Sequence, residues 1–154
     1  MKELEAFRAA ANDHDVCQTY STKWDECKSR KQVIDLAQNS ACADYVCKAI
    51  AEGWGVQPNI IEDKYSKFIN DEYISQQDGY TSKMYVGYKQ VMEADTTQVI
   101  VITCNGSIEI PNNHVCEILV VDSDITLSGN GVCYVRMFGK CNIVKGKEVK
   151  AHGI

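Results

Sequence analysis

The last third of the chain carries an internal repeat of 17 residues. Residues 99–115, 116–132 and 133–149, written under one another, place aliphatic residues in shared columns. An internal repeat constrains a fold more than local composition does, because one repeat cannot bury its apolar face alone and must stack on its neighbours. One column holds Val101, Ile118 and Val135, and another holds Ile110, Leu127 and Val144.

Each repeat contains two polar turns between stretches of alternating apolar residues. This pattern predicts two short strands in every repeat. The repeat has the size of one coil of a small β-solenoid, in which strands of successive coils stack about 4.8 Å apart. Cys116 and Cys133 begin successive repeats, so we expect them to stack inside the solenoid. The alternatives are a trimeric β-prism, in which the arms of three chains intertwine, and an antiparallel meander of short strands.

Residues 1–95 follow a different period, because their apolar residues recur every three or four positions, as in amphipathic helices. A β-hairpin with the turn Asp78-Gly79 is expected near residues 73–88. Five short helices are expected before it. The first carries the stripe Leu4, Phe7, Ala10 and Ala11, and the second runs from Asp13 to Cys27 with Val16, Cys17, Tyr20 and Trp24 inward. The third follows the N-cap Ser29, with Gln32 in a capping box, and the fourth follows the N-cap Ser40 and ends at Gly53. The fifth runs from Pro58 to about Asn70.

The composition changes near residue 95. Residues 1–98 have a net charge of −5 and residues 99–154 a net charge of zero, and 11 of the 13 aromatic residues precede residue 90. We therefore expect an α+β protein with a helical domain over residues 1–95 and an all-β arm over residues 96–154. The arm is expected to be a short β-solenoid or trimeric β-prism of about three coils. The helices are expected to cover the first coil, which leaves the last coil open, with Lys145, Lys147 and Lys150 on it.

The composition also excludes several classes of protein. The net charge of −5 has the wrong sign for a dedicated nucleic-acid binder. No apolar stretch approaches the roughly 18 residues of a membrane span, and the first residues lack the pattern of a signal peptide, so cytoplasmic synthesis is expected. The eight cysteines form no CxxC pair, and the histidines complete no zinc-finger spacing. We expect buried, reduced thiols, no metal and no cofactor.

Catalytic motifs are absent from the sequence, and the nearest approach to a nucleophile set is His14 one helical turn before Cys17. Such a pair can activate a thiolate. Cys17 lies on the predicted apolar stripe, however, so we expect no enzyme and keep a small Cys–His enzyme as the third hypothesis. Asp122 and Asp124 could bind a hard cation, but solvent-facing acids beside a turn are the simpler interpretation.

Trp54 stands between two glycines, Gly53 and Gly55. A tryptophan in this setting fills the corner between two helices or forms a platform on which a ligand stacks. The second interpretation gives an alternative function. The chain would be a binding module that sequesters a host protein or small ligand through an aromatic surface of Trp54, Tyr80 and Tyr85, with residues 73–88.

A helical base that leads into a short stacked β-arm resembles the plan of small bacteriophage virion proteins, such as head-fibre and tail-attachment subunits. The resemblance depends on the repeat over residues 99–149. It implies an N-terminal domain that docks on the particle and a trimeric β-rich tip that projects from it. We therefore expect a non-enzymatic structural or attachment protein, a homotrimer held by its β-arm, whose helical half docks on a larger assembly such as a virion.

Overall fold

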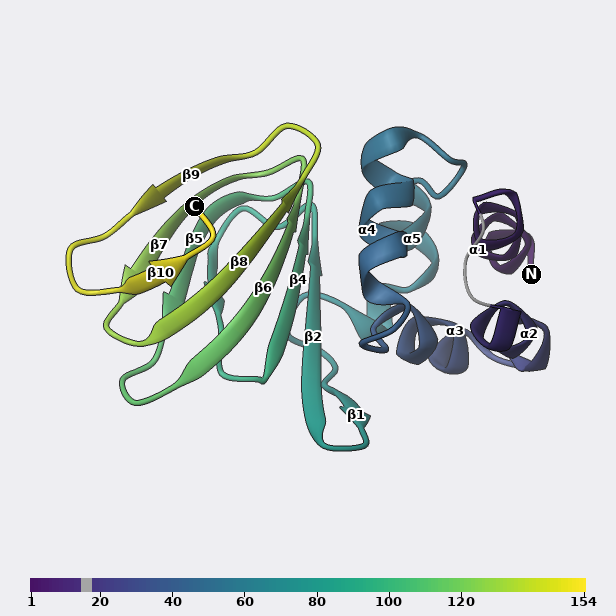
Figure 1. Cartoon of the computed structure of the whole chain (residues 1–154), viewed down its shortest axis with the longest axis horizontal. Coiled ribbons are helices and arrows are strands. Elements are labelled where there is room, and N and C mark those ends of the chain that lie inside the picture. Colours follow the sequence, from purple (N-terminus) through teal and green to yellow (C-terminus); the bar gives the residue numbers. More distant parts are fainter. Residues whose placement is uncertain (15–17) are drawn as a thin grey trace.

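The computed structural model describes residues 1–14 and 18–154 and has the expected α+β fold (Figure 1). Within these residues, short helices form the N-terminal part and a β-solenoid of about four turns forms the C-terminal part. None of the described helices is long and apolar enough to cross a membrane. The helices are α1 (Lys2–Asp13), α2 (Gln18–Glu26), α3 (Arg30–Ala37), α4 (Ala43–Glu52) and α5 (Pro58–Lys64), followed by the 3₁₀ turn η1 (Ser66–Phe68).

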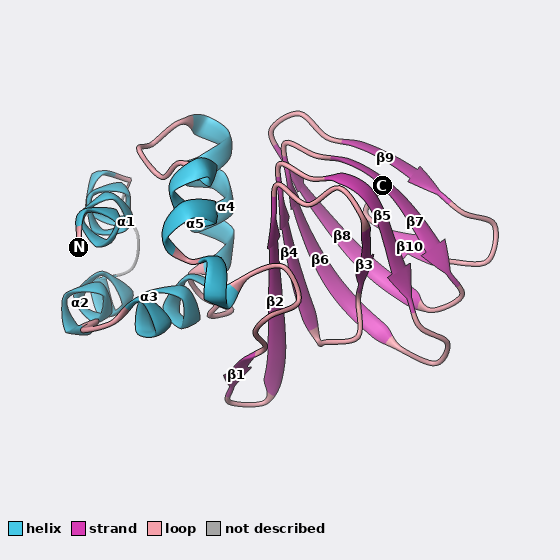
Figure 2. Cartoon of the chain, turned by 180° about the vertical axis from the view of Figure 1, so that it is seen from behind, coloured by secondary structure: helices cyan, strands magenta, loops and turns pink. Residues whose placement is uncertain are grey.

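The strands form two sheets, between which the chain passes alternately as it winds (Figure 2). The first sheet has the order β1-β2-β4-β6-β8-β10 and the second the order β3-β5-β7-β9. Only β1 is antiparallel to its neighbour, and the other pairs are parallel. The strands are β1 (Ser75–Gln77), β2 (Tyr80–Val86), β3 (Val91–Glu93), β4 (Gln98–Ile102), β5 (Asn105–Ile110), β6 (Val115–Val121), β7 (Asp124–Gly129), β8 (Val132–Phe138), β9 (Asn142–Lys145) and β10 (Lys150–His152).

Local sequence signals set several helix ends as predicted. Ser29 Oγ accepts a hydrogen bond from the backbone N of Gln32 (3.3 Å) and caps α3. Gly53 ends α4 in the left-handed conformation, with φ of 73°. Pro58 is the first residue of α5, where its missing N–H costs nothing.

Three predicted helix boundaries are wrong. Asp13, the predicted start of the second helix, is the last residue of α1, and α2 is Gln18–Glu26. The start of α4 is Ala43, not the residue after Ser40, because the Asn39 side chain accepts a hydrogen bond from the backbone N of Ala41 (2.9 Å) and forms a separate turn first. The last helix, α5, ends at Lys64 rather than near Asn70. The predicted second helix is observed as α2, but residues 16 and 17 of its predicted stripe lie outside the described residues.

The coils differ in length, so the 17-residue alignment holds only in places. Paired residues are 16 positions apart between β2 and β4, 19 between β4 and β6, and 17 between β6 and β8. The spacing of 19 between β4 and β6 is two positions longer than the predicted 17. This difference keeps each side chain on the expected face of the sheet, because side chains along a strand alternate with a period of two. The predicted columns are therefore partly wrong in register. The observed neighbours are Val101 with Val120, Ile118 with Val135, Ile108 with Leu127, Thr126 with Val144, and Cys116 with Cys133.

One corner of the solenoid is a column of left-handed residues, one in each turn. Gly87, Thr103, Asp122 and Gly139 have φ values of 63°, 49°, 46° and 74°. They are joined to the next turn by backbone hydrogen bonds, such as Thr103 N to the carbonyl of Val121 (2.9 Å). Glycine takes this conformation without strain, whereas a β-branched residue such as threonine does not.

We therefore predict that Thr103→Gly raises the free energy of unfolding by about 0.5–1 kcal/mol. Thr103 is exposed, so the change removes little packing. Urea denaturation measures the effect. The control is Thr126→Gly, also exposed but within β7, which should lower stability. Equal losses in both variants would show that the left-handed corner is not strained.

The helices cover the outer face of the first sheet. The contacts run from α4 to β6 and β8 and from α5 to β2, so the expectation that the helices close the first coil is wrong. The cause is that the outward side chains of three successive strands are apolar and need cover. These fully buried residues are Met84, Val86, Ile100, Ile102, Leu119 and Val121. A second core fills the solenoid interior, between the two sheets.

The cysteines are packed as small apolar side chains. The seven that the structure describes are free thiols, and Cys116 and Cys133 lie in register inside the solenoid. Burial raises the pKa of Cys116 to about 12 and that of Cys104 to about 11. Cys17 lies outside the described residues.

We predict that brief alkylation of the native protein with iodoacetamide, read site by site by mass spectrometry, labels half-buried Cys27 and Cys141 first. The buried thiols of Cys104, Cys116 and Cys133 should react only when the chain unfolds, because the thiolate is the nucleophile and burial removes both access and charge. Labelling of Cys116 at the rate of Cys27 would contradict the closed interior.

Candidate functional site

The two ends of the solenoid are finished differently. At the first turn, β1 pairs with the start of β2. Beyond β1, Asn70 pairs with the rest of the β2 edge. Its backbone N donates to the Met84 carbonyl (2.9 Å), its Oδ1 accepts from Val86 N (2.9 Å), and its Nδ2 donates to the Val86 carbonyl (3.2 Å). Asn70 and Asp71 both have positive φ, of 57° and 72°, and turn the chain after η1. The first turn of the first sheet is sealed.

An ion cluster lies beside this sealed end. Lys83 Nζ lies 2.9 Å from Asp95 and 3.3 Å from Asp71, and Tyr85 Oη donates to the Asp71 carboxylate. Burial lowers the pKa of Lys83, but the two carboxylates outweigh it, so the pKa is raised. A lysine that stays charged and paired joins the segment before β1 to the solenoid and is poorly suited to act as a base.

The opposite end is open in the described part of the chain. The last strands of the two sheets, β9 and β10, have a neighbour on one side only. Since β10 pairs with only the first three residues of β8, the rest of that edge is uncovered. After β10, Gly153 has a φ of 91° and packs against the Val135 carbonyl so closely that a Cβ atom would not fit. Apolar side chains remain exposed here, with Val144 at 54% and Met137 at 46%.

We call residues 138–154 the solenoid tip. The tip carries four lysines and one glutamate and has a net charge of +3, whereas residues 99–137 have a net charge of −3. The side chains of Lys145, Lys147 and Lys150 are all exposed. In Figures 1 and 2, β9 and β10 lie on the side of the molecule away from the helices. The tip is thus a basic, open sheet edge that points away from an acidic helical half.

Arg136 ties the helical half to the solenoid. It lies on β8, and its guanidinium forms ion pairs with Asp44 of α4 (2.5 Å) and with Glu117 of β6. The sequence analysis did not single out this residue. The only signal was its place as the sole arginine of the arm, and three charges brought together from distant positions cannot be read from spacing.

Of the six residues predicted to form the oligomerisation arm, five are buried within the single chain and are not available to a second copy. Val101, Ile118, Val135, Ile110 and Leu127 are buried in the solenoid interior, where they hold the two sheets together. Val144 alone is exposed, on β9 within the solenoid tip.

The predicted aromatic surface is wrong for Tyr85, which points into the solenoid interior and is fully buried. Tyr80 is half-buried, and its hydroxyl donates to the carbonyl of Gln38 (2.8 Å), which anchors β2 to the end of α3. Trp54 is half-buried at the corner between α4 and α5, as one of its two interpretations predicted. The His14 ring stacks on the Trp54 ring, with the two ring centroids 3.4 Å apart. Cys17, the other member of the predicted catalytic pair, lies outside the described residues.

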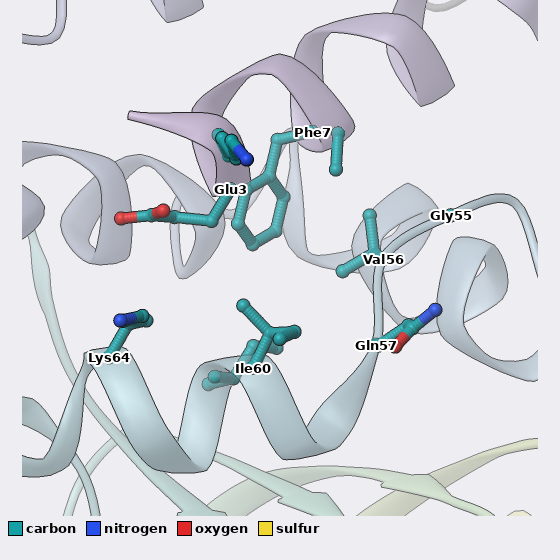
Figure 3. Close-up of a pocket in the computed structure, with 10 residues that line it drawn as sticks. Glu3, Phe7, Gly55, Val56, Gln57, Ile60 and Lys64 are labelled. Atoms are coloured by element: carbon teal, nitrogen blue, oxygen red, sulfur yellow. The ribbon is translucent and has the colours of Figure 1, made fainter.

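A separate apolar groove lies between α1 and α5 (Figure 3). Its charged end holds Glu3, whose carboxylate accepts a hydrogen bond from Arg30 Nε (2.7 Å). Burial raises the pKa of Glu3, but hydrogen bonds from its own backbone and from Arg30, with the charge of Arg30, outweigh this and lower the pKa. The sequence pattern predicts Phe7 as a core residue but gives no sign of the groove, because the loop that completes it lies far along the chain.

We predict that the Glu3–Arg30 pair contributes to stability at neutral pH and is lost in acid. Because the pKa of folded Glu3 is lowered, the contribution is present above the ordinary value of 4.5 and disappears as the pH falls below it. Glu3→Gln should cost about 1 kcal/mol at pH 7 and progressively less below pH 4.5 in urea denaturation. Glu5→Gln, on the exposed face of α1, is the control. A pH-independent loss in Glu3→Gln would rule out the pair as its cause.

Comparison with protein-family models, curated proteins and solved structures found no match. Among the residues that the structure describes, no group of three or more His, Cys, Asp or Glu side chains is placed to hold a metal ion. The chemistry of the surface itself therefore has to indicate a function, and the solenoid tip and the α1/α5 groove are its two distinctive features.

Proposed function

We propose that this chain is a non-enzymatic structural or attachment protein that associates with copies of itself through the solenoid tip and docks on a larger assembly through its helical half. The observation that carries the proposal is the difference between the two solenoid ends. In the first sheet, Asn70 and β1 cover the edge of the first turn, whereas β10 leaves most of the β8 edge open. In the second sheet both end strands, β3 with Val91 and β9 with Val144, keep an open edge beside an exposed valine. Such an edge binds a partner or needs protection from one.

The charge of the tip decides how two copies meet. Two tips placed edge to edge would bring two surfaces of charge +3 together, which opposes association. A tip placed on the helical half of the next copy meets residues 1–68, which hold 9 Lys and Arg against 11 Asp and Glu and so have a net charge of −2. Exposed acids are available there on several helices, including Glu26, Glu52, Glu62 and Asp63. Complementary charge thus favours a head-to-tail contact.

A head-to-tail contact forms a ring when its rotation closes. The ring that we propose is the homotrimer, in which each of the three tips contacts the helical half of the next copy. The helical faces outside these contacts would dock on the larger assembly. A bacteriophage virion is the assembly that the general architecture suggests, and this part of the proposal depends on that architecture alone.

We predict that native mass spectrometry and light scattering at micromolar concentration give three times the single-chain mass of 17.2 kDa. The association should weaken when salt is raised from about 50 to 500 mM, because exposed charges are screened over a few ångströms at high salt. The variant Lys145→Glu, Lys147→Glu, Lys150→Glu should be monomeric.

The matched control is Lys28→Glu, Lys67→Glu, Lys89→Glu, which changes the net charge equally but alters exposed lysines outside the tip. This control should keep the oligomer. A monomeric wild-type chain at low salt, or equal dissociation of both triple variants, would overturn the proposed contact.

A further inference from the structure

The groove between α1 and α5 is a small apolar cavity with a charged end. Its volume is about 340 Å³, at the lower end of the range for small-molecule sites. Phe7, Ile61 and Val56 line its floor and are only 1%, 2% and 4% exposed, whereas Ile60 of α5 is 37% exposed and forms the open side. Figure 3 shows Phe7 and Ile60 facing each other across the hollow, with Glu3 and Lys64 together at one end. An elongated apolar group fits between these walls.

The charged end selects the sign of the ligand. Lys2, Glu3 and Lys64 line it. The carboxylate of Glu3 is already engaged by Arg30, so it offers little to a cation. Among the described residues, the ion pair of Lys64 is with its exposed neighbour Asp63, whose carboxylate lies 3.7 Å from Lys64 Nζ, and such a pair contributes little at a surface. Two ammonium groups at the end of an apolar groove complement an anion with an apolar tail.

We propose that the α1/α5 groove binds a medium-chain alkyl carboxylate, with its chain between Phe7 and Ile60 and its carboxylate at Lys2 and Lys64. The class follows from the site: the walls supply contacts for methylene groups, and the ammonium groups accept one negative charge. The site lies in the helical half and is independent of association through the tip.

Titration calorimetry of the full chain with octanoate and decanoate tests the proposal. Saturable one-to-one binding is expected, tighter by about fourfold for each added methylene. Decanol, of equal chain length without the charge, should bind more weakly than decanoate. The variant Lys2→Glu, Lys64→Glu should weaken decanoate binding by about tenfold and leave decanol binding unchanged. Ile60→Gln, at the exposed rim, should weaken both ligands.

The matched control is Lys48→Glu, Lys89→Glu, which changes the net charge equally at exposed lysines that do not line the groove and should bind decanoate almost as wild type does. Circular dichroism at each ligand concentration verifies that the protein stays folded. Equal weakening by both charge variants would assign the effect to the overall field of the protein and overturn the site. Absence of saturable decanoate binding to the folded wild type, or binding unaffected by Ile60→Gln, would overturn it as well.

Discussion

The structure depends on one sheet that is apolar on both faces. The inward side chains of β4 and β6 fill the solenoid, and their outward side chains, such as Ile100, Ile102 and Leu119, are equally buried under the helices. A fully buried aliphatic side chain contributes about 1.5–3 kcal/mol, so neither layer can be removed without exposing a large apolar area. The helices and the solenoid therefore stabilise each other, and Arg136 adds an ion pair across the boundary.

This two-sided burial also gives the solenoid a direction. The helices anchor the early turns, and the segment that leads out of them supplies β1 and Asn70 to seal the first edge. No equivalent segment of the described chain returns to the last turn, so β9 and β10 stay exposed on one side. Unequal ends follow directly from placing all of the helices before the repeat, and they leave the tip as the place where the fold can be extended by another chain.

The sequence predicted what depends on neighbouring residues and failed where distant segments meet. Ser29, Gly53 and Pro58 act within a few positions, so their roles were readable. The strand register was not, because the coil lengths depend on corners such as Thr103, whose left-handed conformation has no signal in a threonine. The unbroken apolar runs over residues 99–102 and 118–121 are typical of strands buried on both faces, but the prediction of alternating strands did not include this. The predicted hairpin around Asp78-Gly79 is confirmed by the pairing of β1 with β2. Tyr85 was misplaced because the sequence did not show that β2 also pairs with β4 and is the first strand of the solenoid.

The charges of residues 99–154 are separated along the solenoid, which their net charge of zero does not show. Residues 99–154 are neutral as a whole, which suggested arms that pack together without repulsion. Within the fold, the lysines gather in the last turn and the acids in the earlier ones, so the arm has a basic end and an acidic body. A neutral arm with this division favours contact with an acidic surface over contact with its own tip. The same lysines that would protect an open edge from random pairing thus determine which partner it accepts.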